Sequence, residues 1–183
     1  LNLSNFDTTN VTDMGLMFNE CHELKEIKGI ENFDTSNVTN MNAMFQKCNV
    51  LEFLDLSNFD TSIVSDMEAM FSYCHKLKEI KGIENFDTSN VTNMNAMFQY
   101  CRELEHLNLT NFDTSNVTDM IFMFAFCHKL KSIQGINNFN TSKVKDMKAM
   151  FAVCKEIEYL DLSNFDTSNV TNMDCMFSYC FKL

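Results

Sequence analysis

Seven of the eight cysteines recur at one position of an internal repeat, separated alternately by 27 and 26 residues. Thiolates bind metals, form disulfides and act as nucleophiles, but this spacing matches neither a CxxC pair nor any zinc pattern. Coils stacked about 4.8 Å apart would bring neighbouring thiols within disulfide range, although parallel side-chain directions and an odd number of positions disfavour bridges. We therefore predict buried free thiols that pack as small hydrophobic groups, with disulfides as the alternative. The seven positions are Cys21, Cys48, Cys74, Cys101, Cys127, Cys154 and Cys180.

The eighth cysteine, Cys175, lies outside this row. It occupies a position that is alanine in four other copies of the repeat, namely Ala43, Ala69, Ala96 and Ala149. We predict that Cys175 is the one thiol that a reagent reaches in the native protein.

Histidine and aspartate are the other side chains that could support catalysis or metal binding. Three histidines, His22, His75 and His128, directly follow a cysteine of the row, and adjacent residues point to opposite sides of the chain, which argues against a Cys–His dyad. Two rows of aspartates, starting at Asp7 and Asp13, could offer oxygen ligands to calcium. Asparagine replaces aspartate in some copies and no DxDxDG loop is present, so helix capping is the favoured role and cation binding the alternative.

The chain contains no nucleophile elbow, phosphate-binding loop or metal motif. We therefore predict a protein that is not an enzyme, with no catalytic residue, no cofactor and no metal site.

The repeat that places these residues is visible as the identical run LKEIKGIENFDTSNVTNMNAMFQ at residues 24–46 and 77–99, a shift of 53 residues. Within it, an Asn-Phe pair marks seven smaller units of alternately 27 and 26 residues. A fixed period of this size is typical of a solenoid, in which each unit buries its apolar face against its neighbours. We predict a single solenoid over residues 1–183. The marker residues are Phe6, Phe33, Phe59, Phe86, Phe112, Phe139 and Phe165.

Each unit divides into a strand, a turn and a segment of helical period. In LEFLDLSNF, Leu54 and Leu56 alternate with polar or exposed positions, as in a strand with one buried face, and the longer units interrupt this alternation with a glycine such as Gly82. Val38, Met41, Met44, Phe45 and Cys48 form one helical stripe. The FDTSN segment between them is rich in turn and N-cap residues. The invariant Asn before each Phe is predicted to bond turn backbone across the stack.

These elements predict an α/β repeat. We predict a right-handed solenoid with one parallel β-sheet face and short helices on the opposite face.

Charge and composition limit the partners. A net charge of −11 argues against nucleic acid, because phosphate contacts need a basic surface. No apolar run is long enough to cross a bilayer, so we predict no membrane insertion by this segment. The sequence starts and stops within a unit, at Leu1 and Leu183, which indicates a fragment of a longer protein. Its uncapped ends leave end-to-end self-association open.

The unit CxxLxxLxLSNFD followed by MFxxC is similar to leucine-rich repeats of the BspA-like class. FDTSNVTNMxxMFxxC in particular resembles a repeat of unknown function in surface lipoproteins of mycoplasmas and other low-GC bacteria. The resemblance covers essentially all 183 residues. It implies a bacterial cell-surface or extracellular protein with a role in adhesion or protein binding. Asn58 follows Leu56 by two residues, whereas the common leucine-rich pattern LxxLxLxxNxL has three.

A binding site is expected where the copies differ, on the open face of the sheet, since packing explains the residues that stay identical. Two rows differ. The first comprises Glu26, Phe53, Glu79, His106, Ser132 and Tyr159, and the second Lys28, Asp55, Lys81, Asn108, Gln134 and Asp161. The alternating charges at the start of the second row predict cross-strand ion pairs. The face is interpreted as a site for a protein or host-surface ligand, with a passive structural spacer as the alternative, and the exposed aromatic residues favour binding.

Overall fold

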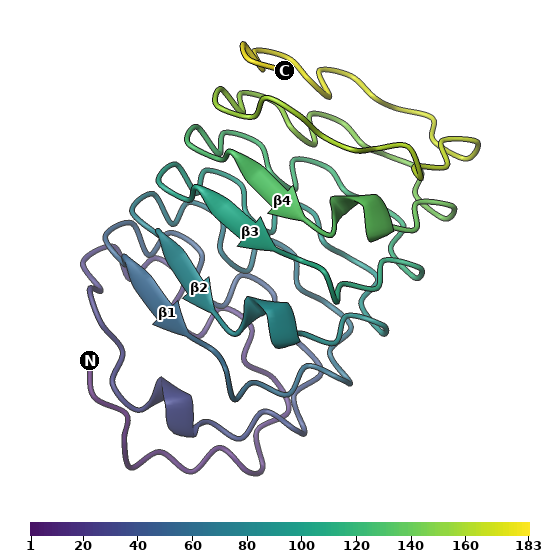
Figure 1. The fold of residues 1–183 in the computed structure, drawn as a ribbon. Coiled ribbons are helices and arrows are strands. Elements are labelled where there is room, and N and C mark those ends of the chain that lie inside the picture. Colours follow the sequence, from purple (N-terminus) through teal and green to yellow (C-terminus); the bar gives the residue numbers. More distant parts are fainter.

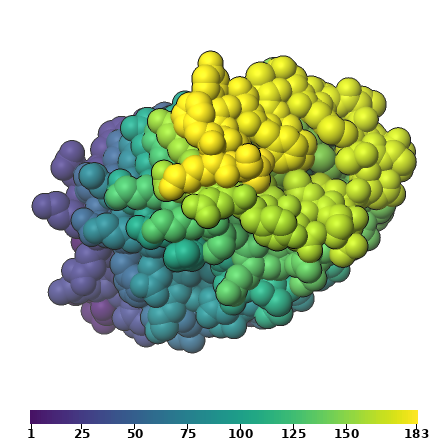
Figure 2. Space-filling model, turned by 45° about the horizontal axis from the view of Figure 1, so that its top comes forward, coloured from purple at the N-terminus to yellow at the C-terminus, as the bar shows by residue number.

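The computed structural model describes residues 1–183 as a stack of similar coils, with the two termini at opposite ends (Figure 1). Figure 2 shows the C-terminal coils forming one end of the stack. Short strands lie on one side of the coils, and the chain returns behind them through turns. The strands are β1 (Phe53–Asp55), β2 (Glu79–Lys81), β3 (His106–Asn108) and β4 (Ser132–Gln134).

The alternation predicted for the strands is confirmed. In β1 the central residue, Leu54, is buried, while Phe53 is exposed and Asp55 half-buried. All strand pairs are parallel, and Leu54 faces Ile80 across the β1–β2 pair. Each strand is only three residues long.

The single continuous sheet that we expected is divided. β1 pairs only with β2 and β3 only with β4, and an isolated parallel bridge joins Asn2 to Lys28 in the first two coils. Every pair therefore joins a shorter coil to the longer coil that follows it. No backbone hydrogen bond joins β2 to β3.

The extra residue of the longer coils explains this division. Gly82 has φ 87°, and a Cβ atom there would overlap the backbone of Ser57 in the preceding coil. Only glycine permits both this conformation and this approach. A 3-10 turn follows each such glycine and bends the chain out of strand geometry before it meets the next coil. The three turns are η1 (Ile30–Asn32), η2 (Ile83–Asn85) and η3 (Ile136–Asn138).

The short helices predicted for the opposite face are wrong. The segment from Met41 to Cys48 forms consecutive turns, in which the Met44 amide donates to the Met41 carbonyl and the Cys48 amide to the Phe45 carbonyl. The intervening amides of Ala43, Phe45 and Lys47 donate to carbonyls of the next coil at 2.7–2.9 Å. These amides cannot also close helical turns within their own coil.

This arrangement of turns requires left-handed backbone at non-glycine residues. Ala43 has φ 51° and Lys47 has φ 62°, and the equivalent residues of every other coil also have positive φ. A positive φ at the third residue is the geometry of a type II turn. The coil side that carries these residues is called the turn face below; it comprises residues 41–48 and their equivalents.

The interior is built from side chains that contact their own copies. Successive phenylalanine rings stack along the axis with centroids 5.4–5.8 Å apart and interplanar angles of 2–13°. Methionines such as Met97 and leucines such as Leu54 fill the space on both sides. The stacked rings are Phe18, Phe45, Phe71, Phe98, Phe124, Phe151 and Phe177.

The cysteine row is buried and free of disulfides, as predicted, in all but its end members. Each buried thiol donates a hydrogen bond to a phenylalanine carbonyl of the preceding coil, as Cys74 does to Phe45 at 3.1 Å. Burial raises the pKa of Cys127 to about 12. Cys175 is exposed, but the expectation that it alone is accessible is wrong, because Cys21 on the first coil is exposed too.

The aspartates predicted to cap helices instead close local turns. Asp34 Oδ1 accepts the amide and hydroxyl hydrogens of Ser36, two residues ahead, which lowers the pKa of Asp34. The sequence interpretation missed a buried row of threonines beside them. Thr8 Oγ1, for example, donates to the Asp34 carbonyl and accepts from the Asp34 amide, so one hydroxyl joins two coils.

Candidate functional site on the strand face

The first predicted row faces solvent on the strand side. Phe53 is 48% and Tyr159 73% exposed, and Glu79 and His106 are exposed as well. Glu26 is also exposed, whereas Ser132 is half-buried. Exposed side chains of β1, β2 and β3, including Phe53, therefore share this surface with Tyr159, which lies outside the strands.

In the second predicted row, the aspartates are less exposed and are held by hydrogen bonds. Lys28, Lys81, Asn108 and Gln134 are exposed, whereas Asp55 and Asp161 are half-buried. Both aspartates accept bonds from a serine two residues ahead.

Of the cross-strand ion pairs expected in this row, one forms. Lys81 Nζ lies 2.6 Å from Asp55 Oδ2. The bond from Lys81, together with those from Ser57, lowers the pKa of Asp55 to about 2. Lys28 instead lies 3.9 Å from Glu26 of its own coil.

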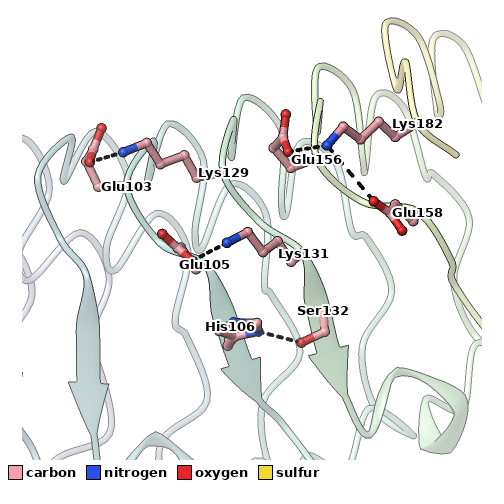
Figure 3. A network of polar contacts seen from close by, with 9 residues as sticks. All are labelled: Glu103, Glu105, His106, Lys129, Lys131, Ser132, Glu156, Glu158 and Lys182. Atoms are coloured by element: carbon pink, nitrogen blue, oxygen red, sulfur yellow. Dashed lines mark hydrogen bonds and ion pairs between the residues drawn. The ribbon is translucent and has the colours of Figure 1, made fainter.

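A further set of ion pairs on this side was not predicted (Figure 3). Lys129 pairs with Glu103 at 2.7 Å and Lys131 with Glu105 at 2.5 Å, each bond linking two neighbouring coils. Lys78 and Lys182 make equivalent pairs with Glu52 and Glu156 at 2.6 Å. The signal was a lysine 26 residues after each glutamate. The pairs of Lys78, Lys129 and Lys131 span the coil junctions that the strand pairs β1–β2 and β3–β4 also span, whereas the pair of Lys182 spans a junction without strands.

The junctions without strand pairing are open on the strand face. Between β2 and β3 a hollow of about 400 Å³ has Ile80, Ile83 and Leu107 among its lining, and His106 and Glu79 also line it. An equivalent hollow of about 430 Å³ lies one double repeat earlier, between residues 26–31 and β1.

The asparagine row bridges these open junctions. Asn58 Nδ2 donates to the Glu31 carbonyl at 2.8 Å, Asn111 Nδ2 to the Glu84 carbonyl at 2.7 Å, and Asn164 makes the same bond. The prediction that these amides bond turn backbone across the stack is therefore confirmed for these three asparagines and for Asn138 of a longer coil, which donates to the Thr110 carbonyl at 3.3 Å.

Two side chains of the face form a pair with catalytic residue types. His106 Nδ1 lies 2.8 Å from Ser132 Oγ (Figure 3). The remaining ring nitrogen of His106 has no hydrogen-bond partner, so no third group orients the imidazole as a base. No group of three or more His, Cys, Asp or Glu side chains is placed to hold a metal ion. No helix has the length and apolar character needed to span a membrane.

The fold and the repeat define a leucine-rich-repeat-like solenoid. The family model described as "Mycoplasma protein of unknown function, DUF285" matches residues 1–81, 47–134 and 107–183, so the chain belongs to this family. This confirms the resemblance drawn from the repeat. No curated protein shows significant similarity to the chain.

Two solved structures show similarity. A leucine-rich repeat protein from Eubacterium ventriosum matches 90% of this chain with a TM-score of 0.55 and 18% identity, which supports the shared fold. The chain spans 39% of the length of that protein. A leucine-rich repeat protein from Bacteroides ovatus aligns over 92% of this chain and 56% of its own, with 14% identity and a TM-score of 0.27.

Proposed function

We propose that the chain is a non-catalytic protein-binding or adhesion module of a bacterial cell-surface protein and that it binds through the strand face. The observation that carries this proposal is the first row, where side chains differ from coil to coil and include exposed Phe53, His106 and Tyr159. Exposed aromatic residues are enriched at protein interfaces. The membership of a repeat family from mycoplasmas supports a surface location.

The acidic side chains around these aromatics favour a protein partner with basic groups. Glu79 and Glu84 border the hollow between β2 and β3, and neither makes an ion pair. The partner would cover the aromatic side chains and the open junctions together. The alternative is a passive spacer, in which the face is solvated and holds another domain at a distance.

Binding to a panel of purified extracellular-matrix proteins tests the proposal. We expect the triple variant Phe53→Ala, His106→Ala and Tyr159→Ala to lose binding while its unfolding free energy changes by less than about 1 kcal/mol, because the side chains are exposed. Ile63→Ala, an exposed apolar change in a loop outside the face, is the matched control and should bind normally. A triple variant that binds as well as the wild type would support the spacer instead.

A further inference from the structure

One row of the turn face carries aromatic rings that stack outside the main core. It consists of Glu20, Lys47, Tyr73, Tyr100, Phe126, Val153 and Tyr179, one residue per coil. Tyr73 and Tyr100 stack with centroids 4.4 Å apart, and Tyr100 and Phe126 with centroids 4.2 Å apart at an angle of 5°. We call this set the ring row.

Val153 interrupts the ring row between Phe126 and Tyr179. Valine is too small to fill the place of a ring, and a hollow of about 220 Å³ is present there. Phe126, Val153 and Tyr179 line it, together with Ala149 and Ala152. Phe126 and Tyr179 lie two coils apart, which is about 9.6 Å at the usual strand spacing. Stacking at the separations seen elsewhere in the row leaves room for one ring between them.

The residues around this hollow depart from the repeat in a consistent direction. Ala125 and Ala152 stand where other coils have Asn19, Gln46, Ser72, Gln99 and Ser178, and Phe122 stands where four copies have alanine. Ala125, Ala149 and Ala152 form a second apolar cluster, separate from the core, against which Phe122, Phe126 and Val153 pack. Ala125 and Ala152 thus remove polar side chains beside the hollow, although Lys148 and Ser178 still contribute to its lining.

The backbone at Val153 is strained. Its φ is 63°, a left-handed conformation that is an outlier for a β-branched residue and costs on the order of 1–3 kcal/mol. Tyr73, Tyr100, Phe126 and Tyr179 adopt the same conformation without a branched Cβ. Strained residues of this kind cluster at active sites and ligand-binding sites.

We propose that this hollow binds one aromatic ring, carried by a phenylalanine or tyrosine side chain of a partner protein, which completes the ring row by stacking between Phe126 and Tyr179. The hollow is one ring wide and opens to solvent, so the rest of the partner remains outside. The proposal concerns a surface other than the strand face and does not depend on the function proposed for that face.

Cys175 lines the hollow and reports its occupancy. The probe is N-acetyl-phenylalaninamide, and the rate at which iodoacetamide modifies Cys175 is followed by mass spectrometry. Cys21, exposed on the first coil, is the internal control. We expect the probe to slow the modification of Cys175 and to leave that of Cys21 unchanged. N-acetyl-cyclohexylalaninamide, which has the same bulk without π electrons, should protect about tenfold less well if stacking holds the ring.

Val153→Phe is the decisive variant, because it fills the hollow with a residue that the ring row already accepts. We expect its melting temperature to rise, since the branched residue is removed, and the protection of Cys175 by the probe to be lost. Tyr179→Ala should weaken protection about tenfold by removing one stacking partner. Ile63→Ala, a change of an exposed apolar residue that does not line the hollow, should leave protection unchanged.

Three results would overturn the proposal. The first is protection that persists in Val153→Phe, and the second is equal protection by the aromatic and the cyclohexyl probe. The third is tighter binding of free toluene than of the capped amino acid, which would assign the hollow to small aromatic molecules.

Discussion

The interior and the strand face of this protein use the same repeat in opposite ways. In the interior, each coil presents the same phenylalanine, methionine, threonine and cysteine, and each contacts its own copy one coil away. On the strand face, the first row holds an acid, an aromatic or an imidazole at one and the same position. A change at an interior position breaks contacts with two neighbours, whereas a change on the face mainly alters a contact with water. The repetition is therefore explained by packing, and variation marks where binding can differ.

Met97→Ala tests the interior side of this comparison and has the largest expected effect. Met97 is fully buried in a central coil, so the variant should lose about 2–5 kcal/mol of unfolding free energy through the cavity it leaves. Chemical denaturation measures the change. Met17, the equivalent residue of the first coil, is 39% exposed, and Met17→Ala should cost clearly less. A loss below about 1 kcal/mol for Met97→Ala would contradict a uniformly packed interior.

The buried thiols predict a pH dependence of intermediate size. The pKa of Cys127 is raised to about 12 from 9.0, so the native state keeps a proton that the unfolded state releases. Stability from this group is complete below pH 9 and is lost as the pH rises toward 12. Cys127→Ala should make the fall of unfolding free energy shallower by about 1.4 kcal/mol per pH unit.

Chemical denaturation of the wild type and of Cys127→Ala between pH 7 and pH 11 measures this difference. The difference in unfolding free energy at pH 7 is subtracted, because it reports only the loss of the side chain. If the unfolding free energies of the two proteins fall in parallel as the pH rises, burial does not hold the Cys127 thiol protonated.

Lys129→Gln tests the strand side and has the smallest expected effect. The pair with Glu103 is partly exposed, so its loss should cost less than about 1 kcal/mol and even less in high salt. Lys76→Gln, a change of an exposed lysine outside any ion pair, is the matched control for denaturation in low and high salt. A loss as large as that of Met97→Ala would mean that the strand face is as constrained as the interior.

The sequence predicted the parts of the fold that depend on side-chain period alone. The burial of Leu54 and Ile80, the parallel pairing of their strands and the free thiol row all follow from residues that repeat at a fixed spacing. The interruption at Gly82 was also visible, but not its effect on the next junction. That effect depends on how closely Gly82 approaches Ser57, which lies in another coil.

The helix prediction failed because the stripe from Val38 to Cys48 also fits consecutive turns. The two structures differ in where the amides of Ala43, Phe45 and Lys47 donate, and their acceptors lie a full coil away. No local signal marks them, since neither alanine nor lysine is a usual residue for left-handed backbone. Aspartates at the turn were misassigned for the same reason, because there was no helix for them to cap.

Most side chains of the candidate face are exposed, as expected, but several of their contacts were not predicted. Exposure of Phe53 and His106 followed from strand alternation, whereas Tyr159 is exposed in a segment that forms no strand. The hollows followed from the division of the sheet, which the sequence did not reveal. Val153 is visible in the sequence as a valine at a repeat position that is aromatic in four other coils. Its importance depends on the turns, which place this position on the surface.

The direction of the hydrogen bonds on the turn face gives the stack an electrical polarity. In every coil that has a successor, at least three amides, such as those of Ala43, Phe45 and Lys47, donate to carbonyls of the next coil. One row of amides beside them points the other way, as the Thr39 amide does to the Thr12 carbonyl. Aligned peptide dipoles add, as they do in an α-helix, although here they run along the axis of the stack across separate coils. Because the forward-pointing amides outnumber that row, the net dipole on this side of the coils has its positive end toward the coils of higher residue number.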